Sequence, residues 1–128
     1  MSAASDYLED KILEHTLGIS AFTAPSTVYL ALFTSDPTDA GTGTEVSTGG
    51  YTRQTISFAA VSGGSVSSNA DITFGPATAD YGTVGWIGVY DSSSAGNLLY
   101  HGSLSASKTI ETNDSFVVES GDLTITLD

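Results

Sequence analysis

The spacing of apolar residues changes near Phe22, and this change constrains the fold more than any other feature of the sequence. Before it, Leu8, Ile12, Leu13 and Leu17 recur at helical spacing. After it, short segments of alternating apolar and polar residues are separated by clusters of Gly, Ser, Asn and Asp. The pattern predicts a mainly β fold: an antiparallel, jelly-roll-like β-sandwich of about seven strands with one N-terminal α-helix.

The helix is expected over residues 5–18. Ser5 suits the N-cap position, acidic residues fill the first turns, and Gly18 supplies a left-handed stop. An isolated helix of about 13 residues is only marginally stable in water, so this helix must dock on another surface.

The strands and the connections between them belong to one domain, residues 1–128, with the sandwich over 27–128. Segment 27–34 is apolar on both faces, which predicts a central strand covered by a sheet on one side and by the helix or a neighbouring subunit on the other. The loop 35–50 has no periodic pattern and is long for a compact domain, so we expect it to be functional or ordered by a partner. Strands are expected at 27–34, 53–59, 70–74, 84–90, 98–104, 115–119 and 123–127.

Charge limits the partners of the chain. The sequence has 15 Asp and Glu against 3 Lys and Arg, for a formal net charge of -12. Nucleic-acid binding depends on cations that replace phosphate counterions, so DNA and RNA are not expected partners, and neither is an anionic membrane. No apolar run is long enough for a membrane span, and the first residues do not resemble a signal peptide. We therefore expect a product that stays in the cytosol or in a particle assembled there.

Residues for catalysis are few. Cysteine is absent, and no nucleophile elbow or zinc-binding helix motif occurs. His15 and His101 are interpreted as amphipathic residues at the edge of a core or an interface. Gly82, Gly85 and Gly88 do not form a dinucleotide-binding pattern and instead indicate close approach of other groups to a strand. The expectation is a protein that is not an enzyme and needs no cofactor.

A binding module remains an alternative class. Asp36, Asp39 and Glu45 share the long loop and are weak candidates for Ca²⁺ ligands, but their spacing does not match an EF-hand, so solvated turn residues are the favoured interpretation. The aromatic residues could bind carbohydrate, although core packing is favoured for them. They are Trp86, Tyr51, Tyr81, Tyr90 and Tyr100. Arg53, one of three cations, is expected to pair with a carboxylate within the subunit or across an interface.

Several stretches together resemble a known protein family. They are 5–9 with Lys11, Leu13 and His15; 29–34 followed by 37–41; 49–51 with Arg53 and Gln54; 88–91; and 96–100 with Gly102. This set is similar to small virion proteins of tailed bacteriophages, commonly labelled tail-fibre or tail-fibre-like. The resemblance spans nearly the whole chain and implies a structural virion protein with no catalytic residues to transfer.

Within a virion, two placements compete. A capsid decoration or cement protein needs one compact domain with an extended element, and this is the favoured placement; a tail fibre or other tail or neck subunit involved in host attachment is the alternative. Virion exteriors are built from symmetric copies, so we expect a homo-oligomer, and a trimer in particular, on the exterior of the head or tail. Its partners would be its own copies and other virion proteins such as the major capsid protein. The interface candidates are Leu8, Ile12, Tyr29, Phe33 and Arg53.

Overall fold

In a computed structural model, which describes residues 3–127, the expected helix forms α1 (Asp6–Thr16). Ser5 has extended backbone angles (φ -73°, ψ 162°), and its hydroxyl oxygen accepts a hydrogen bond from the Leu8 amide at 3.2 Å. Past the helix, Gly18 takes φ +75°, a left-handed conformation that favours glycine. The start and stop signals in the sequence are therefore confirmed.

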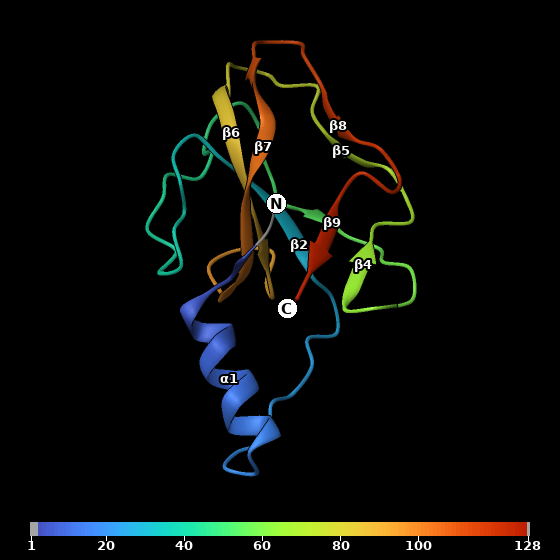
Figure 1. Cartoon of the computed structure of the whole chain (residues 1–128). Helices are drawn as coiled ribbons and strands as arrows, with labels where there is room; N and C mark the ends of the chain where they lie inside the picture. The colour runs from blue at the N-terminus through green and yellow to red at the C-terminus, as the bar shows by residue number, and fades with distance from the viewer. Residues whose placement is uncertain (1–2, 128) are drawn as a thin grey trace.

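One antiparallel sheet forms the main layer of the fold (Figure 1). Within it, β2 (Tyr29–Phe33) pairs with β6 (Gly82–Tyr90) in the register Leu30 opposite Val89 and Leu32 opposite Ile87. In spatial order the strands are β1 (Ala3–Ala4), β7 (Leu98–Ile110), β6 (Gly82–Tyr90), β2 (Tyr29–Phe33) and β3 (Gln54–Thr55).

Two short antiparallel strand pairs form the second layer. β4 (Ser65–Ser67) pairs with β9 (Thr124–Thr126), and β5 (Ile72–Phe74) pairs with β8 (Phe116–Val118). Every segment expected to be a strand overlaps one, and the mainly β, sandwich-like fold with an N-terminal helix is confirmed. The sequence pattern missed β1 and β4.

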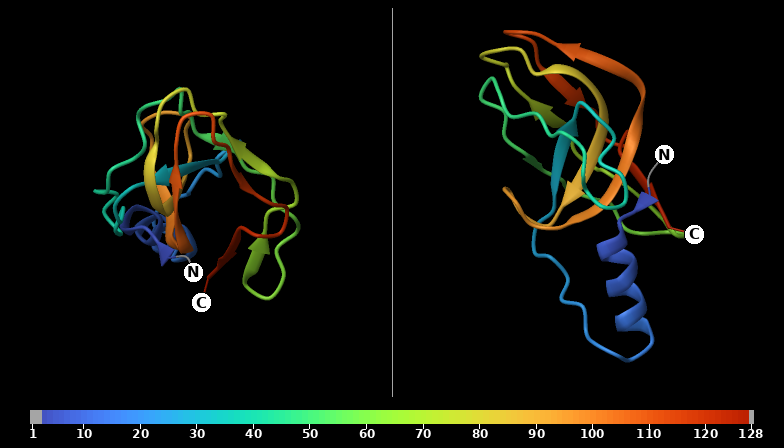
Figure 2. Two further views of the ribbon diagram at one scale, coloured as in Figure 1. Left: turned by 90° about the horizontal axis from the view of Figure 1, so that it is seen from above. Right: turned by 90° about the vertical axis from the view of Figure 1, so that its left-hand side faces the viewer.

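The principal core lies between the two layers, whose arrangement is seen in Figure 2. Leu30, Leu32 and Val89 of the main sheet face Phe74 and Ile125 of the strand pairs, and all five side chains are buried. Burying apolar surface is the main driving force for folding, so this contact holds the layers together.

The opposite face of β2 carries a second core of Ala31, Phe33, Tyr90 and Leu98. We expected the helix or a neighbouring subunit to cover this face. Instead, other parts of the chain lie against it: Gly41 of the long loop is close to the Leu98 side chain, and Arg53, just before β3, lies over the Tyr90 ring. The loop is thus ordered by its own chain.

Candidate interaction surface

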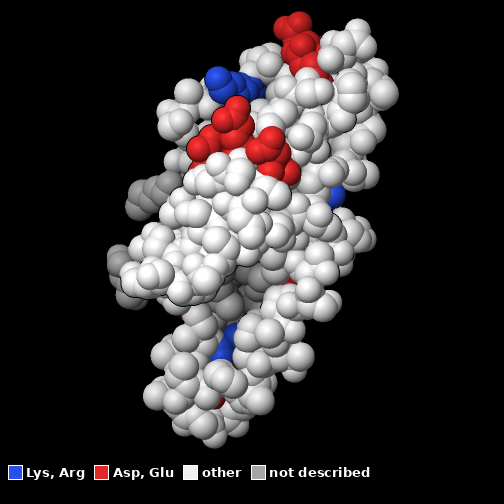
Figure 3. All heavy atoms as spheres, turned by 90° about the vertical axis from the view of Figure 1, so that its right-hand side faces the viewer, with Lys and Arg blue, Asp and Glu red and all other residues white. Residues whose placement is uncertain are grey.

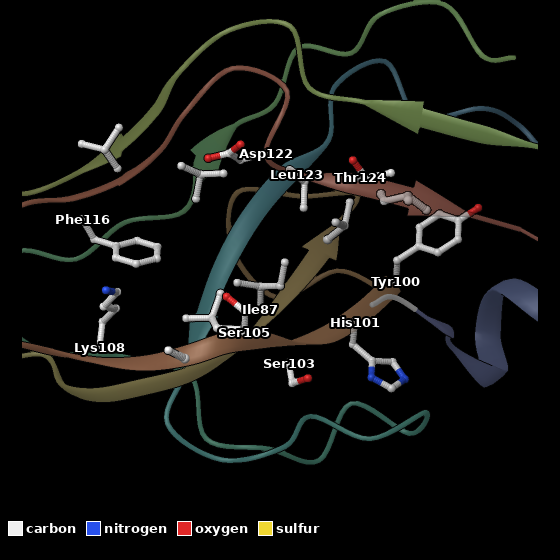
Figure 4. Close-up of a pocket in the computed structure, with 16 residues that line it drawn as sticks. Ile87, Tyr100, His101, Ser103, Ser105, Lys108, Phe116, Asp122, Leu123 and Thr124 are labelled. Atoms are coloured by element: carbon white, nitrogen blue, oxygen red, sulfur yellow. The ribbon is translucent and has the colours of Figure 1, made fainter.

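A groove with a volume of about 410 Å³ opens between the main sheet and the second layer. Ile87 and Val89 of β6 and Leu104 of β7 line one side, and Phe116 and Leu123 line the other. Figure 4 shows Ile87, Tyr100 and Lys108 rising from the main sheet toward Phe116 and Leu123. The groove is the open side of the sandwich, and its lining combines these apolar residues with polar ones such as Ser105 and Thr124.

The strand edge beside this groove is interrupted. β1 pairs with β7 only at Tyr100 and His101, and no other described strand within residues 3–127 pairs along that edge. Ser103 lies opposite Trp86 and Lys108 opposite Val84, so residues 104–107 bulge opposite Gly85. Bulges twist an edge and break its hydrogen-bonding pattern, so this edge is a poor template for an added strand.

The groove contains one cation with no ion-pair partner. Among the lysines and arginines of residues 3–127, Lys11 and Arg53 each pair with a glutamate, whereas Lys108 pairs with none. Lys108 is exposed in the groove, and Asp122 lies on the opposite wall. His101 points away from the groove (Figure 4) and contacts Asp39 at 2.7 Å.

On the side viewed in Figure 3, acidic side chains gather in the upper part, and most of the remaining surface is uncharged.

A second feature is the α1 arm, which we define as residues 6–28: α1 and the extended segment that returns to β2. Figures 1 and 2 show the arm projecting from the β layers. Its base is fixed, since the Ser5 amide donates to the Leu99 carbonyl at 2.9 Å and the Asp6 amide to the Asp39 carbonyl at 3.0 Å. His15 Nδ1 accepts from the Phe22 amide at 3.1 Å and so holds the returning segment against the helix.

The outer part of the α1 arm is apolar and exposed. Leu13 is 56% exposed, Leu17 68% and Ile19 73%. Leu8 faces the opposite way and is 6% exposed, so it anchors the arm to the body. Exposed large apolar residues that gather on one element are typical of an interaction surface.

Arg53 joins two loops on the second face of the main sheet. Its Nε and Nη2 donate to the two carboxylate oxygens of Glu45, both at 2.8 Å. Its Nη1 donates to the carbonyls of Ser92 at 2.9 Å and Ala95 at 2.8 Å, and the guanidinium lies 3.7 Å from the Tyr90 ring centre. The expected pairing with a carboxylate thus occurs inside the subunit, with Glu45 of the long loop, and the same guanidinium also binds carbonyls of the hairpin loop 91–97.

Glu45 also accepts a hydrogen bond from the Tyr51 hydroxyl at 2.7 Å. Burial opposes ionisation of Glu45, but the hydrogen bonds from Arg53 and Tyr51 and the charge of Arg53 outweigh it, so its pKa is lowered. Burial, followed by the neighbouring carboxylate, raises the pKa of Tyr51. The group is a charged link between loops, held by several hydrogen bonds.

The three candidate calcium ligands are separated in the structure. Asp36 accepts from the Thr38 amide at 2.9 Å, Asp39 contacts His101, and Glu45 contacts Arg53. Within residues 3–127, no group of three or more His, Cys, Asp or Glu side chains is placed to hold a metal ion. Each carboxylate already serves a local contact.

The interface candidates lie at different depths. Leu8 and Phe33 are buried inside the subunit, Arg53 is held by its loops, and Ile12 and Tyr29 are half-buried. The exposed apolar residues of the helix are therefore Leu13 and Leu17, which the helical pattern included but did not distinguish from the inward-facing ones.

The aromatic residues mostly serve packing. Tyr51 stacks on Phe74 with ring centres 5.9 Å apart and meets Tyr81 edge-on at 5.8 Å. Tyr81 and Tyr90 are buried, whereas Trp86 and Tyr100 are half-buried. Tyr100 lines the groove, so it is the tyrosine that a docked group would reach.

The open groove and the projecting arm with its exposed apolar side chains are the main surface features of this sandwich-like module. A family model described as podophage GP4 fiber I protein gp80 matches residues 3–126. The chain therefore belongs to this family of bacteriophage fibre proteins, and the resemblance noted in the sequence is confirmed. No curated protein matches the chain. No helix within residues 3–127 is long and apolar enough to cross a membrane.

Proposed function

We propose that the protein is a non-enzymatic structural subunit of a bacteriophage fibre on the exterior of the virion, assembled from several copies of itself. The observation that carries the proposal is the family match over residues 3–126. That description names a fibre, so it favours the fibre alternative over the decoration placement that the sequence had favoured.

The charge of the chain supports an exterior position. A net charge of -12 repels packaged nucleic acid, and two of the three lysines and arginines are already paired with glutamates. A subunit that lined the inside of a capsid would instead be expected to carry positive charge. Self-association, with three-fold symmetry as the preferred arrangement, fits the way virion exteriors are built from repeated copies.

Capsid decoration is the second candidate. The α1 arm favours it, because a projecting element can reach a neighbouring capsomer. In that case the major capsid protein would be a direct partner.

Immunogold electron microscopy of intact virions separates the two candidates, using antibody raised against the recombinant chain. Gold confined to fibres or to the tail supports the proposed function. Gold distributed over the whole head supports decoration instead. Virions that bind no gold, although the antibody recognises the recombinant chain, contradict an exterior position.

A further inference from the structure

The α1 arm and the groove are complementary features of one chain that do not meet within it. The groove is lined by residues of β6–β9 and the turns beside them, and no α1 residue lines it. About 150 Å³ is enough for a benzene-sized group, so a groove of about 410 Å³ has room for two or three such groups. The exposed Leu13, Leu17 and Ile19 supply apolar groups of that kind.

Charge is also complementary between the two surfaces. Glu9 and Asp10 lie one turn before Leu13 and, at 100° per residue, flank the face that carries Leu13 and Leu17. Lys108 in the groove has no ion-pair partner among the described residues. Lys11 projects from the opposite side of the helix, so the face that would enter the groove carries acids only. Asp122 reduces this charge complementarity, because its carboxylate would repel the acids of the helix. It lies on the wall opposite β7, the strand that carries Lys108.

An added β-strand is a poorer occupant of the groove. A strand donated by a partner needs a continuous edge of free backbone groups. β1 already occupies the β7 edge at Tyr100 and His101, and residues 104–107 bulge out of register. Side chains carried on a rigid helix fit this interrupted edge better than an extended backbone does.

We propose that the α1 arm of one copy docks in the groove of a neighbouring copy, with Leu13 and Leu17 in the groove and Glu9 and Asp10 near Lys108. This inference rests on the self-association in the proposed function and names the surfaces that produce it. The contact joins two different surfaces, so successive copies form a closed ring or an open row.

Two kinds of variant test the contact. The arm variant carries Leu13→Ser and Leu17→Ser, and the groove variant carries Ser105→Glu, a change at an exposed β7 residue that lines the groove (Figure 4). Val61→Glu is the matched control, since Val61 is 72% exposed and lies outside both surfaces. Circular dichroism and thermal unfolding show whether each variant is folded. If Ser105→Glu does not fold, Lys108→Glu is a second groove variant.

Light scattering coupled to size-exclusion chromatography gives the mass of each species. We expect the wild type and Val61→Glu to self-associate and each arm or groove variant to associate at least about tenfold more weakly. A mixture of the arm variant with the groove variant should form a heterodimer, because the groove of the first accepts the arm of the second. Complementation of this kind requires contact between the two surfaces.

Two results overturn the proposal, and they differ in meaning. If the wild type associates and both variants associate equally well, other surfaces join the copies and only the present inference fails. If the wild type is a monomer at every concentration, self-association itself fails, while the position on the virion remains a matter for the immunogold experiment.

Discussion

At the scale of single residues, Arg53 shows how one buried cation can organise two loops. Its guanidinium is planar and has five N–H donors, so it can bind a carboxylate with two parallel hydrogen bonds and still reach two carbonyls. Its side chain is only 7% exposed, so the contacts are poorly screened by water. The charge of lysine sits on a single ammonium nitrogen, so lysine cannot bind both carboxylate oxygens and both carbonyls in this arrangement.

Replacing Arg53 by lysine should lower the free energy of unfolding by about 1–3 kcal/mol, because Glu45 and the two loop carbonyls lose donors. Urea denaturation followed by circular dichroism measures the change. Lys11→Ala is the control: it removes the exposed pair with Glu14 and should change the free energy by no more than about 0.5 kcal/mol. Equal effects of the two substitutions would show that the Arg53 link does not stabilise the fold.

The lowered pKa of Glu45 predicts a specific loss of stability in acid. A carboxyl group with a depressed pKa in the folded state stabilises the fold above its unfolded pKa, about 4.3, and loses this contribution as the pH falls through the folded pKa. The difference in free energy of unfolding between the wild type and Glu45→Gln should therefore be constant near neutral pH and shrink below about pH 4.3. Urea titrations over a pH series measure it, and a difference that stays constant down to pH 2 would contradict the cause assigned to the shift.

The sequence could predict that Arg53 is paired, because an isolated cation in so acidic a chain will find a carboxylate. It could not name Glu45 as the partner. Glu45 lies in a loop without periodicity, and the bond depends on where that loop crosses the sheet. The same reason explains why Asp36, Asp39 and Glu45 looked like a possible cluster in sequence but have separate partners in space.

At the scale of elements, a strand was predictable where burial on one face imposes alternation. β5 and β9 show this alternation, whereas β2 is buried on both faces and was marked instead by a continuous apolar run; each of the three lies within its expected segment. β4 was missed because Val66 is the only large apolar residue in a run of Ser and Gly. β7 was expected to end at residue 104 but continues to Ile110, since its second half is an exposed edge with no alternation to mark it.

The glycines of β6 illustrate how close packing selects a residue. A Cβ atom on Gly88 would lie 2.9 Å from Leu98 Cδ1 and 3.1 Å from Phe33 Cε1, both in the second core. A Cβ atom on Gly85 would meet only the Ser107 Cβ at 3.8 Å, an ordinary contact. The sequence predicted close approach at these glycines, and the structure finds it at Gly88.

Gly88→Ala should therefore lower the free energy of unfolding by about 1–3 kcal/mol through overpacking. Gly85→Ala, in the same strand, should be neutral or stabilising by a few tenths of a kcal/mol, because alanine loses less backbone entropy than glycine on folding. Thermal and urea unfolding of the pair measure the contrast. A Gly88→Ala protein as stable as Gly85→Ala would mean that the second core is loosely packed.

At the scale of the whole molecule, the groove and the α1 arm could not be read from the sequence. The walls of the groove come from β6 and β7 on one side and from β8 and β9 on the other, and their distance depends on how the two layers meet. The outward direction of Leu13 and Leu17 depends likewise on Leu8 docking inward. Fold class and family follow from local patterns, whereas docking surfaces follow from tertiary packing.

Net charge would act on the proposed assembly of copies as a whole. Copies that each carry a charge of -12 repel one another, and one pairing of Lys108 with an acid offsets little of this repulsion. Raising the salt concentration from about 0.01 M to 0.15 M shortens the screening length from about 30 Å to 8 Å. The dissociation constant for self-association should therefore fall severalfold, as sedimentation equilibrium would measure. Association that is independent of salt, or weaker at high salt, would contradict this account of the balance of forces.

The most direct test of the structural role is quantitative mass spectrometry of virions purified by density-gradient centrifugation. A structural subunit assembled from symmetric copies should be present at a fixed ratio to the major capsid protein, in several copies per particle, through repeated purification. A chain that is abundant in the infected lysate but absent from purified particles would contradict the account, and a soluble binding module would then be the better explanation.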